Sequence, residues 1–383
     1  MYINTNVAAL FAQNSLNNTQ NSLNTLQQEM STGYQINSPA DNPSGLAIAN
    51  MMQGEIGGIN AAVNNANQAS NLLNVANGGM QTNVQIVQEI QQLAVQASNS
   101  TNNSSDTQDI QNQINSLLQS LDNVGATLNY NNQAVLNEGP TVSPSGSIGL
   151  SQAVTQIAVG ADSGSTGAGS YTVSVQYSTA LSADVVSIVN ASGTVASGDV
   201  SGLPSTGDVT LQLVSGSNTN ADSFAVTVNQ GTIAANYSAT AYTAQFTIAP
   251  GTNYTFQTGP NQGSGNNTTL AFGTFNSVTL GLSTINVQAS TSAQYAITQA
   301  QNALSMLSNA QGQVGAQVDQ LNYTISNLQT ENTNLQSSQA TIMDANMATV
   351  TSQFAQQQIL MQTGIQALQT SQQLPSLVLK LLG

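Results

Sequence analysis

Basic side chains are almost absent from the sequence. Its 383 residues include one Lys or Arg against 16 Asp and Glu, giving a formal net charge of −15 at pH 7, and there is no His, Cys or Trp. Without His or Cys the chain has no Ser-His-Asp triad, no Cys-His nucleophile and no structural zinc site. One basic residue also excludes a Walker lysine, an arginine clamp for phosphates and nucleic-acid binding. The composition therefore argues against an enzyme and against a nucleic-acid-binding protein.

Long apolar runs and metal-ligand patterns are missing as well. The longest apolar stretches fall far short of the roughly 18 residues of a transmembrane helix, so we expect no membrane segment. The opening Met1-Tyr2-Ile3-Asn4-Thr5-Asn6 has no basic or apolar region of the Sec type, so we expect no cleaved signal peptide. The Asp residues between positions 184 and 222 lack EF-type spacing, and we expect no metal and no cofactor.

Two long arms show apolar residues at spacings of three and four. They cover residues 1 to about 140 and about 286 to 383. The first arm carries a seven-residue repeat and then a second stripe: Ile59, Ala66, Leu73, Met80, Val87 and Ala94, followed by Ile110, Ile114, Leu117, Leu121, Val124 and Leu128. The second arm carries Ala293, Ile297, Ala300, Leu304, Leu307, Val314, Val318, Leu321, Ile325, Leu328 and Leu335. Such long, narrow stripes are typical of coiled coils and helical bundles.

Breaks and caps divide the arms into helices. Gly33, Pro39, Pro43 and Gly45 should separate the first arm into two helices. Ser105 and Asp106 are candidate N-caps for the helix that follows, and Pro375 should kink or end the last one.

The segment between the arms has the pattern of β-strands. Apolar and polar residues alternate at 171–177, 209–213 and 224–228, with weaker copies around 246–248 and 254–256, and Gly-, Ser- and Asn-rich spacers separate them. We therefore predict a mainly α protein with a β insert. Its N- and C-terminal arms form a long antiparallel coiled coil or bundle, and a central antiparallel β-rich module projects from it.

The two extreme ends carry stripes of their own. They consist of Ile3, Val7, Leu10, Leu16, Leu23 and Leu26 at the start, and Met343, Met347, Val350, Phe354, Met361 and Leu368 near the end. Helices with so few charges are poorly stable alone, and further copies of the chain are the simplest source of partners. We predict that these twelve residues pack between subunits. Contacts of this kind that do not close on themselves build a helical filament.

Motifs at both ends resemble bacterial flagellins. The first segments are Ile3-Asn4-Thr5-Asn6-Val7-Ala8-Ala9-Leu10 and Met30-Ser31-Thr32-Gly33-Tyr34-Gln35-Ile36-Asn37-Ser38-Pro39-Ala40-Asp41. The last are Ala340-Thr341-Ile342-Met343-Asp344-Ala345-Asn346-Met347-Ala348 and Gln373-Leu374-Pro375-Ser376-Leu377-Val378-Leu379-Lys380-Leu381-Leu382. The resemblance covers about 1–140 and 286–383.

The resemblance implies five regions. Residues 1–44 and 341–383 would form inner-tube helices, 45–140 and 286–340 the surrounding helical shell, and 141–285 a variable outer region. It also implies a secreted, extracellular homopolymer used for swimming. Its partners would be the flagellar type III export apparatus, the cap and hook-junction proteins, and a cytoplasmic chaperone at the C-terminal helix. Two alternatives remain open: a hook–filament junction protein, and a secreted surface adhesin or sheath-like protein.

The chain departs from the family in one consistent way. Gln35, Glu89, Gln91, Thr341 and Met343 occupy positions at or beside which flagellins usually carry basic residues. Two hypotheses explain the loss of basic residues: adaptation to acid surroundings, and resistance to trypsin-like proteases, which would find only Lys380.

Overall fold

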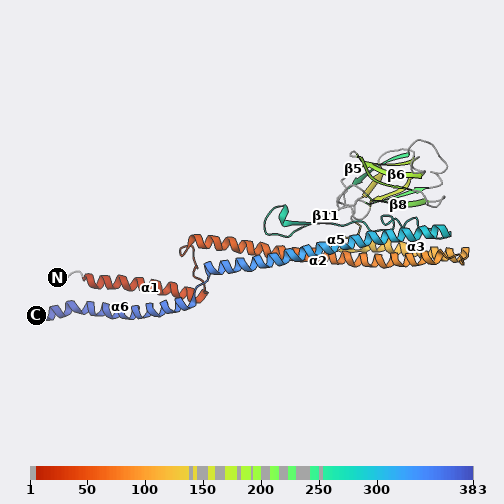
Figure 1. The fold of residues 1–383 in the computed structure, drawn as a ribbon. Coiled ribbons are helices and arrows are strands. Elements are labelled where there is room, and N and C mark those ends of the chain that lie inside the picture. Colours follow the sequence, from red (N-terminus) through yellow and green to blue (C-terminus); the bar gives the residue numbers. More distant parts are fainter. Residues whose placement is uncertain are drawn as a thin grey trace. The chain divides into compact units, whose positions relative to one another are not determined.

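The computed structural model describes residues 6–137, 141–144, 154–159, 169–178, 183–190, 193–199, 208–214, 223–229, 242–249 and 253–382. The helices in these ranges are α1 (Val7–Thr32), α2 (Pro43–Ala97), α3 (Ser104–Thr127), α5 (Ser290–Met343) and α6 (Met347–Leu382), with a short 3-10 turn at Ser264–Asn266 (Figure 1). The helical ends with a β-rich middle confirm the predicted fold class.

The described residues divide into two compact units. The terminal unit comprises Met1–Val63, Gly259–Asn261 and Ser326–Gly383, and the central unit comprises Asn64–Thr258 and Gln262–Ile325. Each of the long helices α2 and α5 contributes one section to each unit.

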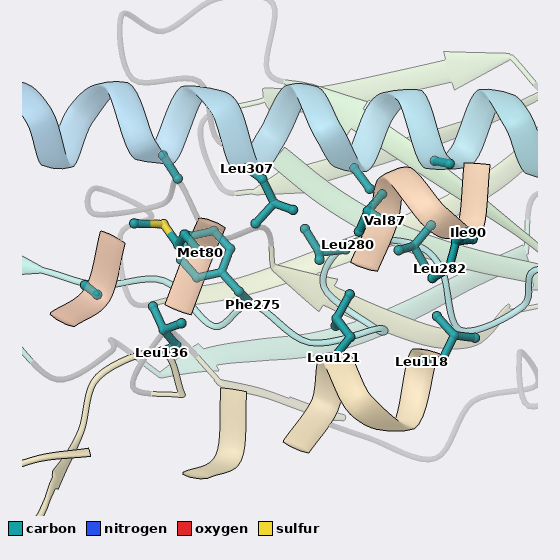
Figure 2. Close-up of a cluster of buried hydrophobic side chains, with 14 of the residues drawn as sticks. Met80, Val87, Ile90, Leu118, Leu121, Leu136, Phe275, Leu280, Leu282 and Leu307 are labelled. Atoms are coloured by element: carbon teal, nitrogen blue, oxygen red, sulfur yellow. The ribbon is translucent and has the colours of Figure 1, made fainter. Parts of the chain in front are cut away.

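The core of the central unit lies between α2, α3 and α5. All six residues of the first seven-residue repeat, from Ile59 to Ala94, are buried, with Ile59 belonging to a small cluster in the terminal unit. Figure 2 shows side chains from α2, α3 and α5 meeting those of the loop around 275–282. The core residues that it labels are Met80, Val87, Ile90, Leu118, Leu121, Leu136, Phe275, Leu280, Leu282 and Leu307.

Residues 272–287 join this core although they carry no periodic pattern. Gln111 of α3 donates through Nε2 to the Ile285 carbonyl at 3.1 Å and accepts from the Val287 N–H at 2.8 Å. Asp122 accepts from the Ser277 N–H at 2.6 Å and from its hydroxyl at 2.9 Å. These bonds hold the segment on α3, so its apolar residues pack with the helices.

The middle of the chain forms antiparallel sheets. The strands are β1 (Asn129–Tyr130), β2 (Gln133–Ala134), β3 (Thr141–Pro144), β4 (Val154–Val159), β5 (Gly169–Ser178), β6 (Ala183–Asn190), β7 (Gly193–Asp199), β8 (Asp208–Val214), β9 (Ser223–Asn229), β10 (Tyr242–Ala249), β11 (Asn253–Gln257) and β12 (Asn267–Ala271). A five-stranded sheet has the order β3-β10-β5-β6-β7, a three-stranded sheet β4-β9-β8, and two hairpins pair β1 with β2 and β11 with β12. The five predicted strand segments fall in β5, β8, β9, β10 and β11.

Two local predictions are wrong. Helix α3 begins at Ser104, and its N-cap is Asn103, whose side chain accepts from the N–H groups of Ser105 and Asp106. Asp106 occupies the third helical position and accepts from the Asn103 N–H, which completes a capping box. Helix α6 does not end at Pro375 but continues to Leu382, so the prediction that this proline ends the helix is wrong, while a kink there stays a prediction.

Adjacent glycines in α2 provide a test of core packing. A Cβ built on Gly79 would lie 2.5 Å from Leu128 Cδ2 and 2.8 Å from Leu136 Cδ1, whereas a Cβ on Gly78 would meet nothing within 4 Å. We expect Gly79→Ala to destabilise the chain by about 1–3 kcal/mol, since buried Leu136 must move. The matched control Gly78→Ala should stabilise it by up to about 1 kcal/mol through helix propensity. Urea unfolding followed by circular dichroism measures both, and equal effects of the two substitutions would contradict the packing described.

Candidate functional site

In the terminal unit, α1 and α6 run antiparallel and pack along one seam (Figure 1). The less exposed side chains recur at spacings of three and four on both helices. They are Leu16, Leu23, Leu26 and Met30 on α1, and Val350, Phe354, Met361 and Leu368 on α6. Gly364 lies against Leu16, because a Cβ there would come within 3.2 Å of Leu16 Cδ1.

Hydrogen bonds fasten this hairpin at both ends. At one end Asn6 caps α1 by accepting from the Ala9 N–H at 3.1 Å, and its Nδ2 donates to the Ser371 carbonyl at 2.8 Å. At the other end Gln35 donates its N–H to the Met343 carbonyl at 2.7 Å. At the same end, the carbonyl of Gly33 accepts from the Ala345 N–H at 2.8 Å, and Gly33 itself adopts a left-handed conformation at φ 78°. The two helices are therefore held in one register.

Large apolar side chains lie exposed outside the seam. On α1, Val7, Leu10 and Phe11 are 67%, 57% and 77% exposed, and their spacing places them on one face of the helix. On α6, Ile359 is 61% exposed, and Leu360 and Ile365 are also open to solvent. Apolar side chains gathered in this way indicate a contact surface for another protein.

The twelve residues predicted to lie between subunits fall into two sets. Val7, Leu10 and Met347 are exposed. Leu26 and Val350 are buried within the chain, and the half-buried residues are Leu16, Leu23, Met343, Phe354, Met361 and Leu368. Ile3 lies outside the described residues. Apart from Met343, the buried and half-buried residues belong to the seam, so α1 and α6 of one chain already supply partners for each other.

On the described parts of α1 and α6, four large exposed apolar residues were not predicted from the sequence. They are Phe11, Ile359, Leu360 and Ile365. Phe11 stands four residues after Val7, a spacing that could have revealed it. The three on α6 lie off the repeat that runs through Phe354, Met361 and Leu368, and a search along a single repeat passes over them.

Carboxylates in this unit have no basic partner nearby in sequence, because Lys380 is the single basic residue of the chain. Burial, followed by the charge of Asp41, raises the pKa of Glu29. The N–H groups of Ser38 and Asn37 lower the pKa of Asp41, whose Oδ2 accepts from them at 2.7 and 3.0 Å. The bonds to Asp41 hold the turn between α1 and α2.

Within the described ranges, no group of three or more His, Cys, Asp or Glu side chains is placed to hold a metal ion. Among the same residues, no helix combines the length and apolarity needed to cross a membrane. What the arrangement offers chemically is therefore apolar packing surface.

The two ends of the chain match known protein families. The model of the bacterial flagellin N-terminal helical region matches residues 3–141, and that of the C-terminal helical region matches residues 284–382. Flagellin E of Vibrio cholerae is 37% identical over 87 residues, which are 23% of this chain and 23% of that protein. Flagellin FlaB1 of Treponema pallidum is 26% identical over 136 residues, 36% of this chain and 48% of that one. The chain thus spans less than half the length of these curated relatives.

Solved structures resemble the chain only loosely. Flagellar hook associated protein-3 of Legionella pneumophila is 15% identical with a TM-score of 0.34, covering 76% of this chain and 97% of that one. FliC of Burkholderia pseudomallei is 17% identical with a TM-score of 0.27, covering 65% and 98%. The identification therefore comes from the two family models, which together match more than half of the sequence: the chain belongs to the bacterial flagellin family.

Proposed function

We propose that the chain is the structural subunit that polymerises with copies of itself into the extracellular flagellar filament used for swimming, and that it is not an enzyme. The observation that carries this proposal is the exposed apolar face of the α1–α6 hairpin, around Val7, Leu10 and Phe11. Membership of the flagellin family supports it.

Assembly follows from the hairpin's geometry. The seam keeps α1 and α6 together as one unit, and the exposed residues are free to pack on the next copy. Burying a Leu or Phe side chain contributes about 1.5–3 kcal/mol. Ile3, Val7, Leu10 and Met347 would join Phe11 and Ile359 in these contacts. Repeated without closing on themselves, the contacts extend into a helical filament.

The proposed regions and partners follow those of the family. Residues 1–44 and 341–383 would line the inner tube, 45–140 and 286–340 would form the helical shell, and 141–285 would face outward. The subunit would leave the cell through the flagellar export apparatus. A chaperone would cover α6 before export, and the cap and hook-junction proteins would contact the two ends of the filament.

The alternatives differ in measurable ways. A hook–filament junction protein would be a trace component of sheared filaments, whereas a filament subunit would dominate them. A surface adhesin would depend on its central module, whereas a filament subunit would swim without it. The curated relatives quoted above carry flagellin names, which favours the filament subunit.

Exchanging exposed apolar residues tests the assembly face. We expect Leu10→Gln with Phe11→Gln to leave the monomer helical, because neither side chain lies in the seam. The change should raise the free subunit concentration in equilibrium with filaments by about 100-fold or more, since two apolar side chains per contact are lost. The control Gln13→Ala with Ser31→Ala alters exposed polar residues of the same helix that lie off the face of Phe11 and off the seam, and it should have little effect. Sedimentation and negative-stain microscopy report the outcome; normal filaments from the Gln variant would refute the assigned face.

The sheet register permits a clean removal of the central module. Thr141 of β3 pairs with Ala249 of β10, so a short Gly-Ser linker can replace residues 142–248 without straining the remaining chain. We expect this variant to form filaments and support swimming. A chain lacking residues 343–383 should form none, because α1 then has no partner. Loss of filaments from the first variant, or normal filaments from the second, would contradict the proposed division of roles.

A further inference from the structure

The chain has 16 carboxylates and a single basic side chain, Lys380. Ten of the carboxylates belong to the helical arms: Glu29, Asp41, Glu55, Glu89, Asp106, Asp109, Asp122, Asp319, Glu331 and Asp344. The other six are Glu138, Asp162, Asp184, Asp199, Asp208 and Asp222. Apart from Lys380 and the N-terminal amine, none of them can find a cation within the chain or in an identical copy.

Neutral amides take the place of ion pairs between the long helices. In the terminal unit, Asn332 donates to Asn60 Oδ1 at 2.9 Å, and Gln339 donates to Gln53 Oε1 at 3.0 Å and to the Ala49 carbonyl at 3.2 Å. These bonds join α2 and α5 through groups whose charge does not change with pH. The packing of α2 on α5 at these positions therefore does not depend on ionisation.

Among the side chains that the structure describes, three carboxylates accept hydrogen bonds, and each bonds to neutral groups. Asp41 and Asp106 accept within a turn and a helix cap, and Asp122 accepts from Ser277. Because the pKa of Asp41 is lowered, its contribution to stability is present above the unfolded value of about 3.9 and is lost as the pH falls. Because the pKa of Glu29 is raised, its contribution has the opposite sign and is lost as the pH rises. Acid therefore weakens the turn at Asp41 and favours the folded state at Glu29.

Between copies the carboxylates act together. At pH 7 each subunit carries a formal charge of −15, and packing copies closely brings like charges together. Salt screens this repulsion, since the Debye length falls from about 30 Å at 0.01 M to about 8 Å at 0.15 M. Free Asp and Glu side chains titrate near pH 3.9 and 4.3, so acid removes most of this charge. A chain with as many Lys and Arg as carboxylates would instead become cationic.

We propose that acid and salt promote polymerisation of this chain, so that its filaments are at least as stable at about pH 2.5 as at pH 7. The proposal rests on the filament function above and assigns the scarcity of basic residues to assembly in acid surroundings. Resistance to trypsin-like proteases, the other explanation, requires no dependence of assembly on pH or salt.

The test measures the free subunit concentration in equilibrium with filaments of the full chain, by sedimentation. At pH 7 we expect it to fall several-fold between 10 mM and 500 mM NaCl. At pH 2.5 it should be at or below the high-salt value and independent of salt. The proposal would be overturned by filaments that form at pH 7 but dissolve at pH 2.5. A free subunit concentration at pH 7 that does not change with salt would overturn it as well. Absence of filaments under every condition would instead reject the filament function itself.

Two variants with equal charge at pH 7 sharpen the test. The first, Glu89→Gln, Asp109→Asn and Asp319→Asn, removes three exposed negative charges from the helical arms. The second, Gln88→Arg, Gln113→Arg and Gln320→Arg, adds three exposed positive charges to the same helices.

Both variants should assemble more readily than the parent chain at pH 7 and low salt. At pH 2.5 the first should match the parent chain, while the second should be several-fold weaker, because its added charges persist in acid. Circular dichroism at both pH values confirms that each variant is folded. Equal behaviour of the two variants at pH 2.5 would show that charge between copies does not govern assembly.

Discussion

The structure depends on the burial of narrow apolar stripes along helices that carry almost no charge. A helix of this kind gains nothing from ion pairs one turn apart and little from its own hydrogen bonds in water. Its stability must come from a partner that covers the stripe. In this chain the partner comes from the opposite end of the sequence, as α1 finds α6 and α2 finds α5. The two ends of the sequence must therefore meet before either arm is stable.

The same constraint explains what could be read from the sequence. A stripe that must be buried has to repeat with the period of the helix, and the residues from Ile59 to Ala94 are buried as their spacing predicts. Alternation likewise located β5 and β9. Strand β6 was missed, because its apolar residues do not alternate with polar ones. Val186 and Ile188 are buried on one face of the strand, and Val185 and Val189 are apolar residues of the other face. Residues 272–287 gave no pattern, since the buried apolar residues of this loop stand at irregular spacings.

A repeat reveals that a stripe is covered but not which chain covers it. Leu26 and Val350 are buried within one chain, while Phe11 and Ile359 on the same two helices stay exposed. The spacing of Leu26 and Val350 suits a partner helix from the same chain or from another copy. The packing of α1 against α6 shows that the partner comes from the same chain. This is why the sequence did not distinguish the seam within one chain from the exposed face, and why Phe11 and Ile359 were missed. The N-cap of α3 was predicted wrongly for a related reason. Ser105 and Asp106 have suitable side chains, but the side chain of Asn103 is the one that accepts from the N–H groups of both.

Register between nearly uncharged helices needs a polar device, because apolar stripes alone tolerate sliding. Asn332 interrupts the stripe of α5, is buried, and bonds to Asn60 across the helix pair. An ion pair at such a position would pay a large desolvation penalty and would fail when its carboxylate is protonated. An amide pair avoids both problems, at a net gain of only about 1 kcal/mol for each hydrogen bond. Several weak amide contacts are therefore required, and Gln53 and Gln339 form a second such pair further along the same helices. The abundance of Asn and Gln thus follows from building long, specific helix pairs without basic residues.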